Sequence, residues 1–129
     1  MIEVPVSWGE LVDKITILQI KSDRMSDEKK LANVRKELAL LNEKLGRNAE
    51  HSEITRLTGD LHAVNASLWD IEDKIRECEN VGDFGETFVS LARSVYITND
   101  KRSDIKREIN MVLGSGLVEE KSYQSYKIQ

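Results

Sequence analysis

Apolar residues recur three and four positions apart along four stretches of the chain, which is the spacing of one face of an α-helix. The stretches span about 8–25, 27–45, 52–79 and 83–113. The first six residues alternate apolar and polar side chains and include a proline, so we expect an extended lead-in there. The pattern predicts an all-α protein, an antiparallel bundle of about four helices whose third and fourth helices form a long hairpin. One alternative stays open, because residues 15–20 carry enough β-branched side chains to form a strand.

Residues with known preferences mark the ends of these stretches. Ser7 and Glu10 have the spacing of a capping box, in which each side chain accepts the backbone N–H of the other residue. Asp83 and Glu86 repeat that spacing before the fourth stretch, and Ser26 or Asp27 can cap the second. Glycines, which readily take the left-handed conformation that ends many helices, follow the last three stretches at positions 46, 82 and 114.

The predicted helices are unequal in length. At 1.5 Å per residue, the first two are about 27 Å long and the last two about 42 Å, which leaves about 15 Å of apolar stripe uncovered on the longer pair. The C-terminal tail, residues 117–129, a second copy of the chain or another protein partner can cover it. Symmetric self-association is the commonest form of oligomer. We therefore expect a homodimer held by apolar positions of the first and fourth helices.

Composition narrows the functional classes. Charged residues make up 33% of the chain and aromatic residues 5%, a profile typical of helical bundles and coiled coils. The net charge of −4 argues against nucleic-acid binding, since the basic cluster around Lys101 and Lys106 is diluted by acidic neighbours. The lone Cys78 allows no internal disulfide, and no stretch reads as a secretory signal or a membrane span. We expect a cytoplasmic protein without a membrane or nucleic-acid partner.

Two acidic pairs are the candidate metal ligands. Glu10 with Asp13, and Asp70 with Asp73, are three residues apart, so each pair shares one face of a predicted helix. Carboxylates placed in this way hold Mg²⁺ in some enzymes that act on phosphorylated substrates. In a chain with 23 acidic residues, however, such spacings also arise by chance. We therefore expect no cofactor, with Mg²⁺ as the alternative.

A second candidate site interrupts the apolar pattern of the fourth stretch. Arg93, Asn99, Asp100 and Arg102 lie near its middle, and Trp69 of the third stretch lies near them if the hairpin pairs in register. Polar residues at a helix interface either form a buried pair that fixes the register or bind an anion.

Arg102 occupies a heptad position of its own stretch, so it is the residue that best separates these two roles. If it fixes the register, the sequence predicts a carboxylate partner on the third helix, either Asp70 or Asp73.

Several phrases of the sequence resemble one known family. They are VPVSWGELVDKITIL at 4–18, LANVRKELALL at 31–41, LWDIED at 68–73, ARSVY at 92–96 and TND at 98–100. They are similar to the DUF6165-type family of small, uncharacterised, helical bacterial proteins, and the similarity extends to VEEKSY at 118–123. The resemblance implies one domain over residues 1–129 and no assigned activity, cofactor or catalytic residue.

No catalytic constellation of high specificity occurs in the sequence. The leading hypothesis is therefore a non-enzymatic helical oligomerisation or adaptor protein. The alternative is a metal-assisted hydrolase or an anion-binding protein, acting on a nucleotide or a phosphorylated metabolite through the acidic pairs and the arginines of the fourth helix.

Overall fold

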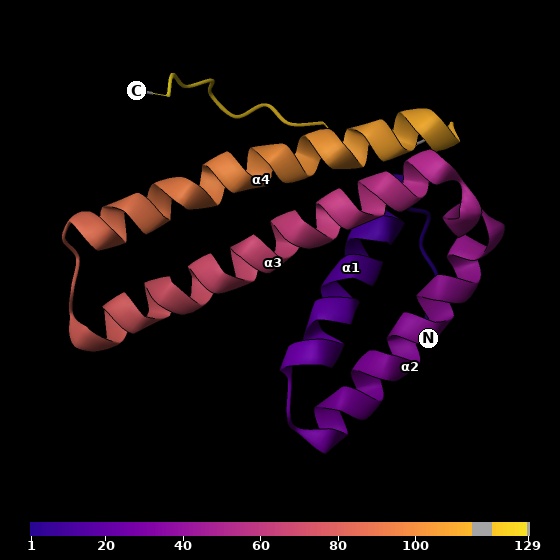
Figure 1. The fold of residues 1–129 in the computed structure, drawn as a ribbon, viewed down its shortest axis with the longest axis horizontal. Coiled ribbons are helices and arrows are strands. Elements are labelled where there is room, and N and C mark those ends of the chain that lie inside the picture. Colours follow the sequence, from indigo (N-terminus) through magenta and orange to yellow (C-terminus); the bar gives the residue numbers. More distant parts are fainter. Residues whose placement is uncertain (115–119, 129) are drawn as a thin grey trace.

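The computed structural model describes residues 1–114 and 120–128, and it is built from α-helices (Figure 1). In chain order these are α1 (Trp8–Arg24), α2 (Glu28–Leu45), a short 3₁₀ turn η1 (Gly46–Glu50), α3 (Ser52–Val81) and α4 (Glu86–Leu113). The described residues contain no β-strand, and residues 15–20 lie within α1. The all-α prediction is confirmed, and the strand alternative is wrong.

At α1 only the Ser7 half of the predicted capping box forms, and at α4 the predicted box does not form. The Ser7 hydroxyl accepts a hydrogen bond from the Glu10 N–H at 3.1 Å, and the Glu10 carboxylate contacts Lys106 of α4. The predicted capping box of α4 is wrong, because Asp83 accepts from the N–H of Gly85 and α4 begins only at Glu86. The Asp83 carboxylate therefore stabilises a turn in the loop and does not cap α4.

The two helical hairpins diverge from one another. Figure 1 shows α1 and α2 leaving the long α3–α4 hairpin at an angle, so that the four axes do not run side by side. α1 packs against α2, α3 and α4, whereas the main neighbours of α2 are α1 and η1. α1 is therefore the central helix, and it covers only the part of the long hairpin nearest to η1 and to the end of α4.

The apolar core lies where α1 meets the other helices. Its buried members are Leu11, Val12, Ile15, Leu45, Ile54, Leu57, Leu61 and Ile109. Leu11, Val12, Ile15, Leu18 and Ile20 of α1 are buried within one chain, and the expectation that apolar positions of the first and fourth helices hold a dimer together stays a prediction. Most of the apolar surface of α1 is therefore part of the intramolecular core.

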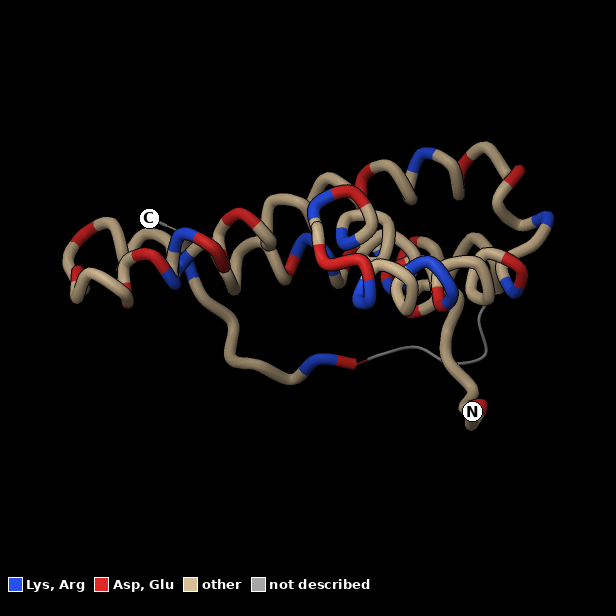
Figure 2. Tube along the Cα trace, turned by 90° about the horizontal axis from the view of Figure 1, so that it is seen from below, with Lys and Arg blue, Asp and Glu red and all other residues tan. Residues whose placement is uncertain are grey.

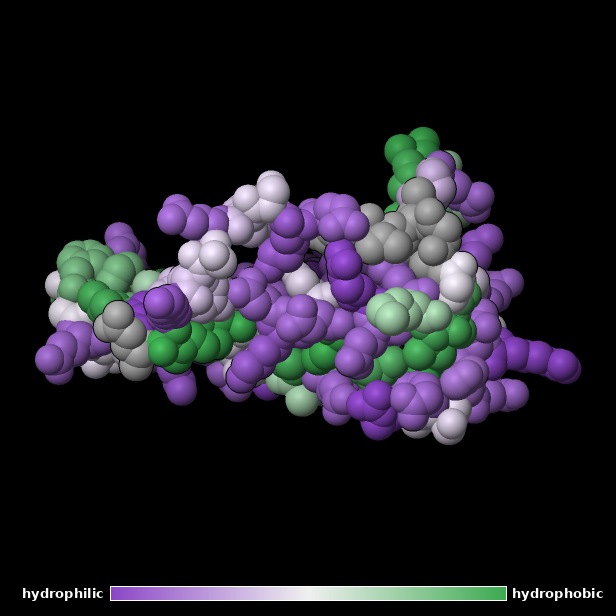
Figure 3. All heavy atoms as spheres, turned by 90° about the horizontal axis from the view of Figure 1, so that it is seen from above, coloured by the Kyte–Doolittle hydropathy of each residue, from purple (hydrophilic) through white to green (hydrophobic). Residues whose placement is uncertain are grey.

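The far half of the long hairpin projects beyond this core. We call residues 68–97 the arm: the second half of α3, the connecting loop and the first half of α4. Cys78 is the one buried residue of the arm, all of which lies in the described part of the chain. Val81 and Phe84 near its end are 79% and 56% exposed, and Figure 3 shows hydrophobic atoms at the surface there. The predicted excess of apolar stripe on the longer helices is present.

The described part of the C-terminal tail runs back beside α4. Residues 117–119 and 129 of the predicted tail lie outside the described residues, while 120–128 follow α4 as an extended segment (Figures 1 and 2). Asp100 accepts hydrogen bonds from Lys121 and from the Tyr126 hydroxyl, both at 2.6 Å. The second of these raises the pKa of Tyr126 to about 12, and the Tyr126 ring packs edge-on against Tyr96. The segment therefore pairs mainly with the outer side of α4.

Candidate functional site

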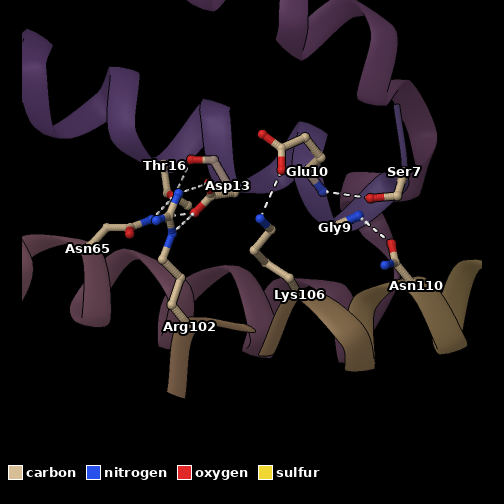
Figure 4. A network of polar contacts seen from close by, with 9 residues as sticks. All are labelled: Ser7, Gly9, Glu10, Asp13, Thr16, Asn65, Arg102, Lys106 and Asn110. Carbon is tan, nitrogen blue, oxygen red and sulfur yellow. Dashed lines mark hydrogen bonds and ion pairs between the residues drawn. The ribbon is translucent and has the colours of Figure 1, made fainter. Parts of the chain in front are cut away.

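A buried carboxylate on α1 is the centre of a polar cluster that joins three helices (Figure 4). The Asp13 side chain is 1% exposed, and both of its oxygens accept hydrogen bonds from Arg102 of α4. The Arg102 Nε donates to Oδ1 at 2.8 Å, and a terminal guanidinium nitrogen donates to Oδ2. This is the bidentate geometry in which arginine binds a carboxylate most strongly and with a fixed orientation.

Two uncharged side chains complete the cluster. Asn65 of α3 donates from its amide nitrogen to Asp13 Oδ1 at 3.0 Å and to the Thr16 hydroxyl at 2.9 Å. The Thr16 hydroxyl in turn donates to the backbone carbonyl of Asp13 at 2.8 Å. Among the described residues, no buried side-chain nitrogen or oxygen is left without a hydrogen bond. The cluster is thus a satisfied network that joins α1, α3 and α4.

The electrostatics of the cluster keep Asp13 ionised. Burial by itself raises the pKa of Asp13, because it disfavours the charged form. The hydrogen bonds from Arg102 and Asn65, together with the positive charges of Arg102 and Lys106, outweigh burial, so the pKa of Asp13 lies below its ordinary value.

The start of α1 is fixed to α4 by a second set of contacts. Lys106, which is nearly buried, donates to the Glu10 carboxylate at 2.8 Å, and the Gly9 N–H donates to the side-chain oxygen of Asn110 at 2.7 Å. A side chain at Gly9 would collide with the backbone carbonyl of Lys106, so only glycine allows the two helices to approach this closely. Three successive turns of α4 therefore each bind one position of α1.

The predicted partner of Arg102 is wrong. Arg102 binds Asp13 of α1, while Asp70 pairs with Arg24 at 2.6 Å and Asp73 is exposed. The reason is topological: α1 lies across both α3 and α4, so α1 presents the carboxylate nearest to Arg102. The ion pair is part-buried and joins α4 to α1 instead of α3, and a role in fixing the helix register stays a prediction.

The candidate metal ligands are dispersed. Glu10 and Asp13 lie near the N-terminus of α1, where Glu10 pairs with the Lys106 side chain and Asp13 pairs with the Arg102 side chain. Asp70 and Asp73 lie on α3, where Asp70 contacts the other end of α1. Within residues 1–114 and 120–128, no group of three or more His, Cys, Asp or Glu side chains is placed to hold a metal ion.

The structure brings several of the predicted ligand-binding residues to one open groove. Trp69, Asp73, Asn99 and Arg102 line a cavity of about 560 Å³ at the angle between α1 and the long hairpin. Its apolar lining comes from Ile17, Ile20 and Leu68, and the Arg24 guanidinium lies over the Trp69 ring, 5.8 Å from its centroid. The other two predicted residues lie elsewhere: Arg93 is exposed on the arm, and Asp100 binds the tail.

Sequence reasoning missed Asn65, Thr16, Lys106 and Asn110. Asn65 follows Leu61 by four positions, so it stands on the apolar face of α3 and was a detectable polar interruption. Asp13 and Thr16 lie three residues apart on a helix whose apolar face is unusually broad, which was a weaker signal of the same kind.

Comparison with known proteins shows the family to which this chain belongs. The model of a family of unknown function, DUF6165, matches residues 2–128. No curated protein and no solved structure matches the chain. In the described part of the chain, no helix is both long enough and apolar enough to cross a membrane.

Proposed function

We propose that this chain, which belongs to the DUF6165 family of unknown function, is a non-enzymatic helical oligomerisation or adaptor protein. In this proposal the helices around α1 form a base, and the arm binds another helical surface in a coiled-coil manner. The simplest such assembly is a homodimer. With its lone cysteine, the protein fits a reducing compartment such as the cytoplasm.

The observation that carries the proposal is the absence of a core in the arm. Along 86–105 of α4, every residue of which is described, none is buried, yet the three-four spacing of Leu91 and Val95 continues the apolar stripe. The stripe of α3 likewise continues through Leu68, Ile71 and Ile75, which are all only half-buried. Long helices gain most of their stability from packing an apolar face. An arm built in this way is stabilised when a further helix covers it.

The polar cluster supports the same function. A network that joins three helices at the base of the arm fixes the direction in which the arm projects. A buried ion pair is weak evidence for stability, and in some proteins such a pair selects one arrangement of the helices over others, which is the role proposed here. A rigid base with a projecting arm is what an oligomerisation or adaptor protein requires.

Light scattering behind a sizing column tests the proposal. The parent protein is expected to be a dimer at tens of micromolar and to dissociate on dilution. Replacing the exposed arm residues Val81 and Val89 with serine is expected to weaken association. The matched control is Met111→Ser, which removes a side chain that is 76% exposed at the other end of α4 and should change nothing. A parent that stays monomeric at every concentration would contradict the proposed self-association.

A second candidate function rests on the groove at the angle between α1 and the long hairpin. Trp69, Asn99 and Arg102 line it, together with Arg76 and the acidic Glu72 and Asp73. Arg102 is paired with Asp13 but its side chain is still 29% exposed, so a ring, an amide and a guanidinium edge are available there to a small anionic metabolite. If so, millimolar phosphate or nucleotide raises the melting temperature of the parent by mass action, and Asn99→Ala diminishes that rise. No comparable observation favours the metal-assisted hydrolase, because Glu10, Asp13 and Asp70 are each paired with a basic side chain.

A further inference from the structure

The arm and α2 carry opposite charge. Residues 68–97 contain seven acidic and three basic residues, a net charge of −4 that equals the formal net charge of the whole chain. α2 contains five basic and three acidic residues, a net charge of +2. Figure 2 shows acidic positions predominating at the far end of the long hairpin. Two arms laid against one another would therefore repel, whereas an arm and α2 attract.

The end of the arm has a groove of helix-binding character. A cavity of about 830 Å³ lies between α3 and α4, with the buried Cys78 and the half-buried Leu91 among its lining residues. Exposed acidic residues, Glu77 of α3 and Glu86 of α4, lie on its two sides, the exposed Lys74 lines it on the α3 side, and the exposed Val81 adds apolar surface. The charged residues of the lining, two acidic and one basic, leave a net negative charge around an apolar floor, which fits an apolar side chain that is flanked by basic ones.

The outer face of α2 has the complementary pattern. Leu40 is 37% exposed, Lys36 and Lys44 lie four residues to either side of it, and the exposed Glu37 and Glu43 lie at the margins of the same face. This face points away from the buried Leu31 and Val34, which pack toward α1. Lys44 contacts Glu3 at 3.8 Å, but its side chain remains 67% exposed. The face is therefore available for a contact with another molecule.

We infer that the groove at the end of the arm receives the outer face of α2 from a second copy of this chain, with Leu40 between the walls and the two lysines against Glu77 and Glu86. This inference rests on the proposed self-association and specifies its surfaces. Since each copy carries both surfaces, a twofold axis makes the same contact twice and closes the assembly as a dimer.

Reciprocal charge reversal tests the pairing. One variant carries Glu77→Lys and Glu86→Lys in the groove, and the other carries Lys36→Glu and Lys44→Glu on α2. Each variant alone opposes like charges at both contacts, so its dimer should be weaker than that of the parent by on the order of tenfold or more at low salt. In an equimolar mixture both contacts regain opposite charges, so a heterodimer should form with about the affinity of the parent. Glu108→Lys, an exposed change on α4 outside both surfaces, is the control and should leave the dimer unchanged.

The outcomes separate the inference from the proposed function. A monomeric parent overturns both. A dimeric parent whose variants stay dimeric, or whose mixture is no tighter than either variant alone, overturns the pairing but leaves self-association standing. A groove variant that dimerises more tightly than the parent would show that arms pair with arms, and an open-ended polymer would exclude the twofold arrangement. Circular dichroism melts verify folding, and the single changes Glu77→Lys and Lys36→Glu repeat the test if a double variant melts early.

Discussion

Replacing Arg102 with leucine is expected to lower the free energy of unfolding by about 3 kcal/mol, near the lower end of the range for breaking a buried ion pair. The loss arises because the Asp13 carboxylate, 1% exposed, is left without the bidentate donor that offsets its desolvation. The lower end of the range applies because the Arg102 side chain is 29% exposed, so water moderates the interaction. Chemical denaturation at neutral pH measures the change.

Two further variants show whether the buried charge is the cause. Adding Asp13→Asn to Arg102→Leu removes the unpaired charge while keeping an amide oxygen that can accept from Asn65, so the double variant should recover part of the lost stability. Arg107→Leu is the matched control on the same helix. Its partner Glu120 is 75% exposed, and the change should cost well under 1 kcal/mol. A double variant as unstable as Arg102→Leu alone would mean that packing, not charge, is what Arg102 provides.

The effect should also depend on pH with a definite sign. The pKa of Asp13 is lower in the folded protein than in the unfolded chain, where an aspartate titrates near about 3.9. Its contribution to stability is therefore fully present above that unfolded value and is lost as the pH falls through the lower folded value. In Arg102→Leu, only the Asn65 hydrogen bond and the Lys106 charge still oppose the effect of burial, so the pKa of Asp13 is higher than in the parent. The stability gap between parent and variant should thus narrow as the pH falls from neutral toward 3.

The helices could be predicted from the sequence because their determinants are local. The apolar spacing, the hydroxyl of Ser7 and the left-handed Gly82 act within a few residues, and each performs in the structure as its type predicts. The start of α4 was misplaced because Asp83 can accept a hydrogen bond either from a helix N–H or from a loop N–H. Spacing alone does not show which of the two is more stable.

The sequence could identify some residues of the candidate site, but it could not show which of them contact one another. Arg102 was identified because a charge in an apolar stripe requires compensation, and this requirement is a property of the sequence. Which carboxylate compensates it depends on the direction in which α1 crosses the long hairpin. That direction is set by the close approach at Gly9 and by the packing of the whole core, which no short-range pattern encodes.

The same reasoning changes which residue of α3 matters most for stability. The apolar stripe of α3 places Leu68 near its centre, which predicts a loss of about 2–5 kcal/mol for Leu68→Ala by the cavity rule. In the structure Leu68 is only half-buried and lines the groove at the angle between α1 and the long hairpin. Leu61, two turns earlier, is 0% exposed in the core.

Leu61→Ala is therefore expected to cost about 2–5 kcal/mol, and Leu68→Ala less than half as much, when unfolding is measured at a concentration low enough for the protein to be monomeric. The difference arises because a truncation leaves a cavity only where neighbouring atoms surround the removed ones on all sides. Denaturant titrations of the two variants measure this difference in the free energy of unfolding. Titrations repeated at tens of micromolar test whether self-association stabilises the arm. If the arm is covered in an oligomer, arm positions such as Ile75 gain neighbours there, and the cost of Ile75→Ala should rise with protein concentration while that of Leu61→Ala stays constant. Equal costs for Leu61→Ala and Leu68→Ala in the dilute protein would mean that the arm packs as tightly as the base without any partner, which would remove the reason for proposing one.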